Sequence, residues 1–364
     1  MRVRIVCYED VDAWILGKFA KKMHENLQKM GISSDIAKVP DASADINHHI
    51  IYVNYDGKKN SVDTIMITHI DTVDKLTLVK KQLENAAAGI CMSRETMLHL
   101  SQMGVHNSKI CYINPAHDEV MPFRKIVVGI TCRVQADGRK HEYFLNKLAN
   151  VLDSKYFKFK IMGDAWDLQV KILRKKGFEV EYTDRFIYDE YIKLIPTLDY
   201  YLYMGMDEGQ MGFIDALAAG VKTIVTAQGY HLDASGGIVH PFTSYEELEH
   251  IFLSLQKEKE DLVHSVTTWN WNDYTKKHVE IWKYLLGENI ESDFSDGLSS
   301  LVNVASGGNV DGAFAKRKMK ELKRNQYSHF YFKKIGRLKK AYSTAGFYGV
   351  AKLIRAKMLN KLDP

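Results

Sequence analysis

The stretch 199-DYYLYMGMDEGQMGFIDALAAGVKTIVT-226 contains the pattern that decides the fold. Residues 199–204 and 222–226 are short runs of mostly apolar, aromatic or β-branched residues, which predict two buried strands. Residues 213–219 between them favour a helix, and Gly220 ends it. A strand, a helix and a second strand in this order predict two parallel strands joined by a helical crossover.

The same alternation continues in both directions along the chain. Further strands are predicted at 2–8, 35–39, 49–53, 64–69, 89–92, 109–113, 125–131, 157–162 and 178–182, and helical patterns separate most of them. A break at 114–119 divides these strands into two groups. We therefore expect an α/β fold of two doubly wound, Rossmann-like domains that face a cleft.

The composition is that of a globular protein with two domains. The chain has 364 residues, of which 46% are hydrophobic and 26% charged, a normal mixture. Buried, reduced thiols are expected at the four cysteines, which have no metal-ligand spacing: Cys7, Cys91, Cys111 and Cys132. The first apolar run is too short for a signal peptide, and no run approaches the roughly 20 apolar residues of a membrane span. We expect a cytoplasmic protein.

The charge is unevenly distributed along the chain. The net charge is +5, but residues 313–364 contain 15 Lys or Arg against Glu321 and Asp363, so this segment is +13 and the rest is −8. A basic amphipathic helix is expected near the end, with an apolar face of Phe347, Val350, Ala351, Ile354, Met358 and Leu362. Such a helix favours an anionic membrane surface, which would make the protein peripheral on the inner face of the membrane. Packing against the acidic body is the alternative, and nucleic acid is not an expected partner.

Three segments of the second half together resemble the nucleotide-binding domain of GT-B glycosyltransferases, in particular the retaining family four. They are 129–133 with 137–140, 159–163, and 207–225, in which Asp207 and Asp215 stand eight positions apart before a small-residue helix and a glycine. The resemblance implies a GT-B fold and a hexosyltransferase that moves a sugar, with retention, from a nucleotide-diphosphate-sugar donor. The acceptor would be a saccharide or a lipid-linked molecule, in cell-surface polysaccharide or glycan synthesis.

The resemblance also gives each part of the chain a role. Residues 1–118 would form the acceptor-side domain, and 119–265 the nucleotide-sugar-binding domain. A helix over 266–288 would cross back and pack on the first domain. Residues 289–364 would form a linker and the basic amphipathic tail.

The diphosphate of a nucleotide sugar needs positive charge around it. Negative charge collects on the leaving phosphate as the glycosidic bond breaks. Arg133 and Lys140 follow a predicted strand, where they can bind the diphosphate, so that no metal or other cofactor is required. The resemblance implies that Asp215 binds the ribose hydroxyls and that Gly163 belongs to the donor-binding region.

Acidic residues are expected at the sugar end of the donor. Asp207 or Glu208 would face the transferred sugar, and the sequence leaves this choice open. Gly209 and Gly212 would let the backbone approach the sugar closely. The resemblance also implies that His69, at the end of a strand in the first half, contacts the sugar.

Some assignments stay open. His231 and Asp233 are further candidates to line the cleft, whereas a metal site that they form with His240 is not expected, because the loop is rich in glycine. Asp replaces the usual Glu of the family at 207 and 215, so a diverged chain that binds a sugar nucleotide or acts as a scaffold is an alternative. A GT-B sugar epimerase, with carboxylates in the same cleft, is another.

Overall fold

The computed structural model describes residues 1–288, 301, 311–331, 335 and 343. The chain divides into two compact units, which are residues 1–119 with 268–364, and residues 120–267. Each unit contains one six-stranded sheet in which the paired strands are parallel. The predicted α/β class, with two doubly wound, Rossmann-like domains, is therefore confirmed.

The sheet of the first unit has the strand order β2-β1-β3-β4-β5-β6. Its strands are β1 (Arg2–Val6), β2 (Ser33–Ala37), β3 (Ile46–His49), β4 (Val62–Ile67), β5 (Ala88–Cys91) and β6 (Ile110–Tyr112). The chain passes from β1 to β2 on one side and then to β3 on the other, so the order switches between β1 and β3. Ligands of doubly wound sheets bind outside the carboxyl ends of the strands at such a switch point.

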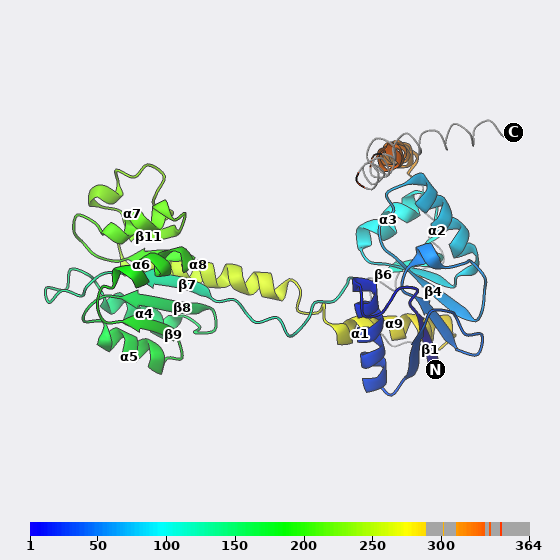
Figure 1. Cartoon of the computed structure of the whole chain (residues 1–364), viewed down its shortest axis with the longest axis horizontal. Coiled ribbons are helices and arrows are strands. Elements are labelled where there is room, and N and C mark those ends of the chain that lie inside the picture. Colours follow the sequence, from blue (N-terminus) through cyan, green and yellow to red (C-terminus); the bar gives the residue numbers. More distant parts are fainter. Residues whose placement is uncertain (289–300, 302–310, 332–334, 336–342, 344–364) are drawn as a thin grey trace. The chain divides into compact units, whose positions relative to one another are not determined.

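Helices cover both faces of the first sheet (Figure 1). α1 (Ile15–Lys29) and α9 (Trp271–Leu285) share a core with one face. α2 (Val73–Asn85), α3 (Arg94–Gln102) and the 3-10 turn η1 (Tyr52–Asn54) cover the other. A second 3-10 turn, η2 (Asn107–Lys109), leads into β6. The first unit is thus built from two parts of the chain that are far apart in sequence.

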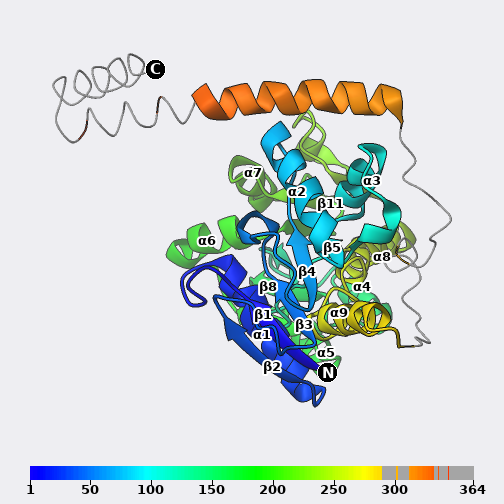
Figure 2. The ribbon, with the colours of Figure 1, turned by 90° about the vertical axis from the view of Figure 1, so that its right-hand side faces the viewer.

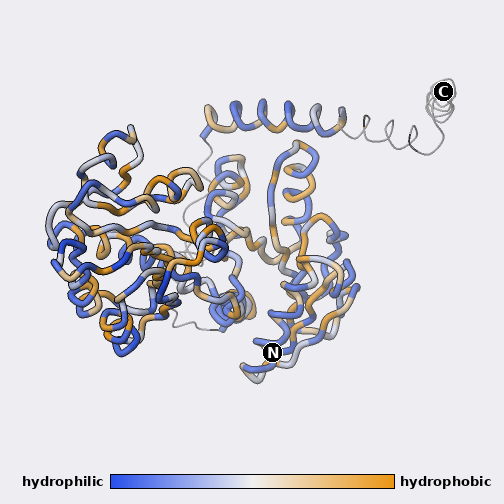
Figure 3. The backbone as a smooth tube through the Cα atoms, turned by 60° about the vertical axis from the view of Figure 1, so that its left-hand side comes forward, coloured by the Kyte–Doolittle hydropathy of each residue, from blue (hydrophilic) through white to orange (hydrophobic). Residues whose placement is uncertain are grey.

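Residues 312–331 form a further helix, which is mostly hydrophilic (Figure 3) and lies across α2 and α3 (Figure 2). Leu322 is 1% exposed and joins the core beneath these helices. The Gln326 side-chain oxygen accepts a hydrogen bond from the Val73 N–H at 3.2 Å. This part of the basic tail therefore packs against the body, and the apolar face predicted over 347–362 lies outside the described residues. No helix in the described part of the chain is long and apolar enough to cross a bilayer.

The sheet of the second unit has the strand order β12-β11-β10-β7-β8-β9. Its strands are β7 (Ile126–Ile130), β8 (Phe157–Met162), β9 (Glu179–Thr183), β10 (Tyr200–Tyr203), β11 (Lys222–Thr226) and β12 (His240–Phe242). The order switches between β7 and β10. The unit also contains α4 (Tyr143–Val151), α5 (Asp167–Lys175), α6 (Tyr188–Leu194), α7 (Met211–Ala218), α8 (Tyr245–His264) and the 3-10 turns η3 (Ile195–Thr197) and η4 (Gly229–His231).

Most strands lie within two residues of their predicted positions, and two differ more from the sequence prediction. The strand expected at 49–53 is β3, which begins three residues earlier and contains Asn47, His48 and His49. These polar side chains are fully buried, and each makes a hydrogen bond to a neighbouring strand or loop, although His48 Nε2 has no partner among the described residues. The edge strand β12 was not predicted. A hydrophobic pattern cannot locate a strand whose buried side chains are polar.

Candidate functional site

The switch point of the second sheet brings two predicted site segments together. The loop after β7 and the loop after β10 follow neighbouring strands. The Gln210 side-chain amide donates a hydrogen bond to the Thr131 carbonyl oxygen at 2.9 Å. A Cβ at Gly212 would lie only 2.4 Å from Thr131 Oγ1, so α7 begins directly against the end of β7. Segments 133–140 and 207–215 thus share one edge of one sheet.

Lys140 and Asp207 form an ion pair that Tyr203 completes. The Lys140 side chain is 8% exposed, and its Nζ lies 2.6 Å from Asp207 Oδ2. The same Nζ donates a hydrogen bond to the Tyr203 hydroxyl at 2.6 Å. The Tyr203 hydroxyl in turn donates to Asp207 Oδ1, which also accepts from the Gly209 N–H at 3.3 Å. Both carboxylate oxygens of Asp207 therefore have hydrogen-bond partners within the protein.

The surroundings fix the protonation of this cluster. Burial would raise the pKa of Asp207, but the hydrogen bonds from Lys140 and Tyr203 outweigh burial and lower that pKa below its ordinary value. Burial, and then the hydrogen bond to Asp207, raises the pKa of Tyr203. Asp207 is therefore ionised at neutral pH, and Tyr203 is a neutral phenol.

Glu208 is placed differently from Asp207. Its carbonyl oxygen accepts a hydrogen bond from the Tyr230 N–H at 3.1 Å, and a Cβ at Gly229 would come within 2.2 Å of that oxygen. The backbone is thus held firmly, while the residue itself is exposed. Of the two acidic residues that the sequence could not separate, Glu208 has the exposed position and Asp207 binds Lys140.

His231 is buried and holds the loop through backbone hydrogen bonds. Its Nε2 accepts a hydrogen bond from the Gln210 N–H at 3.0 Å, and its Nδ1 lies 3.1 Å from the Thr226 carbonyl oxygen. Burial lowers the pKa of His231, so the ring is neutral with its proton on Nδ1. Gly209 has a φ of 120°, and a Cβ there would lie 2.9 Å from the ring. His231 therefore sets the loop conformation, whereas Asp233 is exposed.

Arg133 is exposed, and it follows a tightly packed turn. Trp166 Nε1 donates a hydrogen bond to the carbonyl oxygen of Cys132 at 2.6 Å. Gly163 packs on the same carbonyl, since a Cβ would lie 2.1 Å from it, and its φ of 149° also favours glycine. With its amide oriented to suit its neighbours, Gln135 accepts hydrogen bonds from Arg133 Nε at 3.1 Å and Nη2 at 3.2 Å. Gly163 thus acts by fixing the backbone that presents Arg133.

Asp215 is exposed on α7 and accepts a hydrogen bond from the Tyr191 hydroxyl of α6. Burial, and then this hydrogen bond, raises the pKa of Tyr191. The phenol therefore remains protonated at neutral pH. Tyr191 fixes one oxygen of the Asp215 carboxylate and leaves the residue at the surface.

His69 belongs to the first unit and lies after β4, at the carboxyl edge of its sheet. Its side chain is 71% exposed, and its Nε2 lies 3.6 Å from Asp71 Oδ2. The same nitrogen lies 2.9 Å from Lys75 Nζ, and Lys75 pairs with Asp71 at 2.7 Å. The other predicted site residues belong to the second unit.

Three site residues were missed in the sequence. Tyr203 binds Lys140 and Asp207, Tyr191 binds Asp215, and Gln210 joins α7 to β7. In the sequence, Tyr203 belongs to a predicted strand rich in aromatic residues, and Tyr191 belongs to a predicted helix. Their hydroxyl partners depend on tertiary contacts, so no local signal would have identified them.

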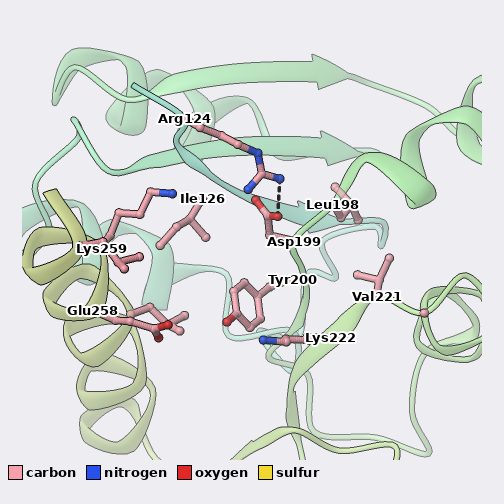
Figure 4. A pocket seen from close by; sticks show the side chains of 12 residues that line it. Arg124, Ile126, Leu198, Asp199, Tyr200, Val221, Lys222, Glu258 and Lys259 are labelled. Atoms are coloured by element: carbon pink, nitrogen blue, oxygen red, sulfur yellow. Dashed lines mark hydrogen bonds and ion pairs between the residues drawn. The ribbon is translucent and has the colours of Figure 1, made fainter. Parts of the chain in front are cut away.

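A cavity of about 350 Å³ lies at the opposite edge of the second sheet (Figure 4). It lies at the amino ends of β7, β10 and β11 and against α8, and its charged lining residues are Arg124, Asp199, Lys222, Glu258 and Lys259. Ligands of doubly wound sheets bind at the carboxyl ends instead, so we do not place the donor here. Among the described residues, no group of three or more His, Cys, Asp or Glu could hold a metal ion.

Comparisons with known proteins add little to this description. No protein-family model matches the chain, and no curated protein matches it. Among solved structures, it is similar to the lipopolysaccharide outer core galactosyltransferase WaaB in its apo form, with 12% identity, a TM-score of 0.31, and coverage of 77% of this chain and 98% of that one.

Two further solved structures are similar. Anabaena Alr3699/HepE in complex with UDP and glucose is 11% identical, with a TM-score of 0.31 and coverage of 78% of this chain and 100% of that one. A glycosyltransferase from Rickettsia africae is 13% identical, with a TM-score of 0.31 and coverage of 79% and 99%. Likenesses this weak do not assign a function, which has to come from the residues themselves.

Proposed function

We propose that the chain is a glycosyltransferase that moves a sugar from a nucleotide-diphosphate-sugar donor to a saccharide or lipid-linked acceptor. The observation that supports it most is the meeting of Arg133 and the Lys140–Asp207 pair at the switch point between β7 and β10. Ligands of doubly wound sheets bind at this point. The donor would lie along the two loops that follow these strands.

Arg133 and the first turn of α7 would bind the diphosphate of the donor. Arg133 is exposed and can offer its planar fork to phosphate oxygens. The side chain of Gln210 does not cap α7, so N–H groups of the first turn can bind phosphate as well. Lys140 is paired with the ionised Asp207, so we propose that its role is to hold the loop. We propose that these groups let the transfer proceed without a metal ion.

Acidic residues would bind the transferred sugar and the ribose of the donor. Glu208 is exposed beside Gly209, so we propose that its carboxylate faces the transferred sugar. Asp215, which Tyr191 orients, would accept hydrogen bonds from the ribose hydroxyls. The resemblance of segment 207–225 to the retaining family supports transfer with retention, and a role in cell-surface polysaccharide or glycan synthesis.

Thermal unfolding with a panel of nucleotide sugars tests this proposal. UDP-glucose, UDP-galactose, UDP-N-acetylglucosamine and GDP-mannose form a suitable panel. A donor at about 100 times its Kd should add about 2.7 kcal/mol to the free energy of unfolding, and the Tm should rise accordingly. Glu208→Gln should retain this binding and lose release of the sugar to water or acceptor. If none of the donors raises the Tm, the proposal is wrong.

A chain that binds a sugar nucleotide without turnover is the second candidate. The observation in its favour is that Asp207, where the resemblance expects a carboxylate that faces the sugar, uses both oxygens inside its loop. In that case a donor would raise the Tm, but neither hydrolysis nor transfer would follow. The wild type and Glu208→Gln would then bind the donor alike, and neither would release its sugar.

We also propose a cytoplasmic protein that lies on the inner face of the membrane and contacts it through the basic tail. Helix 312–331 buries Leu322 against the first unit, and a different stripe of this helix is exposed. Its exposed residues, spaced by three or four, are Lys316, Lys320, Lys323, Tyr327 and Phe330. Tyr327 is 76% exposed and Phe330 67%. Lysines and aromatic rings on one helix face favour the surface of an anionic bilayer.

Charge reversal on this stripe tests the membrane contact. The double variant Lys320→Glu with Lys323→Glu should lower affinity for phosphatidylcholine–phosphatidylserine vesicles by about tenfold or more, because each cation near the surface contributes about 1 kcal/mol. Lys175→Glu with Lys176→Glu, on exposed residues of the second unit, makes the same change in net charge. Equal losses in cosedimentation for both double variants would show that the stripe has no special role.

A further inference from the structure

The cavity at the amino edge of the second sheet has the size of a ligand site. Its volume of about 350 Å³ lies within the range of pockets that hold small molecules, whereas well-packed interiors leave few voids larger than a water molecule. All of its lining residues belong to the second unit. The cavity lies at the opposite edge of the sheet from Arg133 and Asp207, so a ligand here would not compete with the donor.

The floor of the cavity is apolar. β7, β10 and β11 are neighbours in the sheet, and their amino ends meet here beside α8. Five residues of the floor are each 6 to 8% exposed, and they are Ile126, Leu198, Tyr200, Val221 and Leu255. Leu262, further along α8, is 62% exposed. Covering such a surface favours a ligand with an apolar body.

An ion pair neutralises one carboxylate of the lining. Asp199 Oδ1 pairs with Arg124 Nη2 at 2.7 Å (Figure 4). Asp199 Oδ2 accepts a hydrogen bond from the Val127 N–H at 2.9 Å. Both oxygens of Asp199 thus have partners within the protein, and its charge is balanced by that of Arg124.

Two lysines are placed to meet a ligand. Lys222 is the first residue of β11 and Lys259 belongs to α8, so the two side chains reach the cavity from different elements (Figure 4). In the described part of the chain, each ammonium group lies beside an aromatic ring and pairs with no carboxylate. Lys222 Nζ is 5.7 Å from the centre of the Tyr200 ring, and Lys259 Nζ is 5.7 Å from that of Phe123. The remaining carboxylate of the lining, Glu258, cannot balance both lysines.

Capping of the neighbouring helix does not account for Lys222. Helix C-termini attract cations, and α7 ends next to β11. However, the Gly220 N–H donates to the Leu217 carbonyl oxygen at 2.9 Å, and the Val221 N–H donates to the Ala216 carbonyl oxygen at 2.8 Å. The backbone therefore caps this helix end itself.

We propose that this cavity is a second binding site, which takes a small organic anion with a carboxylate or phosphate on an apolar body. The anionic group binds Lys222 and Lys259 through charge-assisted hydrogen bonds. Burial raises the pKa of Tyr200, so its hydroxyl stays protonated and can donate to the same group. Glu258, whose charge also acts on Tyr200, lowers the affinity by repulsion. This inference does not depend on the proposed function.

Methyl NMR of the full chain tests this site with phenyl phosphate and benzoate as probes. The methyl groups of Leu198, Val221 and Leu262 should shift with at least one probe, and the tighter probe shows whether phosphate or carboxylate suits the cavity better. Inorganic phosphate and benzyl alcohol, which each lack half of the ligand, should bind about tenfold more weakly. Added UDP should leave the shifts unchanged. No shift of these methyl groups with either probe, or loss of the shifts with UDP, overturns the proposal.

Variants of opposite charge show whether the ligand is an anion. Lys222→Gln with Lys259→Gln should weaken binding of the tighter probe by about tenfold or more, whereas Glu258→Gln should strengthen it by about threefold. Lys175→Gln with Lys176→Gln, on exposed residues of the same unit, is the matched control and should bind like the wild type. Glu258 is exposed, so its variant gives an answer even if the lysine variant does not fold. Equal weakening by both double variants, or weaker or unchanged binding in Glu258→Gln, would contradict an anion site.

Discussion

Asp207 and Glu208 are adjacent in the chain, yet they differ in what holds them. Lys140, Tyr203 and a backbone N–H bind the Asp207 carboxylate. Glu208 is fixed through its backbone carbonyl and is exposed. We therefore expect Asp207 to matter chiefly for stability and Glu208 chiefly for turnover.

Asp207→Asn should destabilise the second unit, because it leaves Lys140 mostly buried without a counter-charge. Loss of one partner of a fully buried pair costs several kcal/mol, and since the Asp207 side chain is 23% exposed, we expect a loss of about 2 kcal/mol in the free energy of unfolding. Urea denaturation followed by tryptophan fluorescence measures it. Glu208→Gln should unfold like the wild type, and equal destabilisation by both variants would contradict the assignment.

Gly163→Ala should disturb the backbone that presents Arg133. A Cβ at Gly163 would lie 2.1 Å from the Cys132 carbonyl oxygen, so that turn must shift. Gly138→Ala is the control, because Gly138 has a φ of 75° but no atom within 4 Å of such a Cβ. Both variants bear the cost of an unfavourable φ, of the order of 1 kcal/mol. Only Gly163→Ala should also weaken UDP binding in a calorimetric titration, and wild-type affinity would contradict this role of Gly163.

At the scale of elements, α9 packs on the first sheet, and two buried histidines meet where the helix and the sheet contact each other. His278 on α9 and His48 on β3 have ring centroids 5.0 Å apart. Burial lowers the pKa of His278 to about 4. Burial, and then the charge of His278, lowers the pKa of His48 well below its ordinary value. The interface therefore requires both rings to be neutral.

The first unit should lose stability as the pH falls from about 6.5 toward 4. The unfolded chain protonates its histidines near pH 6.5, whereas folded His278 resists protonation until about pH 4. The unfolded state thus binds more protons in this window, and acid favours unfolding. His278 alone should contribute a loss of about 2 kcal/mol between about pH 7 and about pH 5. His278→Gln should reduce this slope in urea denaturation, and an unchanged slope would refute the explanation.

The elements could be predicted where their own residues determine them. The apolar runs of β7 and β11 lie at their predicted positions, and the resemblance of 133–140 and 207–215 was visible as spacing. The polar strand β3 is stable only because partners such as Tyr8 and Asp63 satisfy His49. The Lys140–Asp207 pair joins residues 67 positions apart. Contacts of this kind depend on the folded chain, so a local pattern cannot reveal them.

At the scale of the whole molecule, the tail helix is part of the first unit. Leu322→Ala, which keeps every charge of the tail, should lower the free energy of unfolding by about 2 to 3 kcal/mol, because Leu322 is 1% exposed in a core shared with α2 and α3. Binding of UDP by the second unit should not change. Thermal unfolding and UDP titration of the same sample measure both, and an unchanged Tm would show that the helix does not pack there in solution.

The central claim is that the switch point of the second sheet binds a nucleoside diphosphate through Arg133. Calorimetric titration of the wild type, Arg133→Ala and Arg124→Ala with UDP and uridine, or GDP and guanosine, tests it most directly. Arg124 is the control, because it lies at the opposite edge of the same sheet. We predict that Arg133→Ala weakens binding of the nucleoside diphosphate by about tenfold or more and leaves binding of the nucleoside nearly unchanged. Arg124→Ala should bind both ligands like the wild type. Equal weakening of diphosphate and nucleoside in Arg133→Ala, or no weakening of either, would contradict the claim.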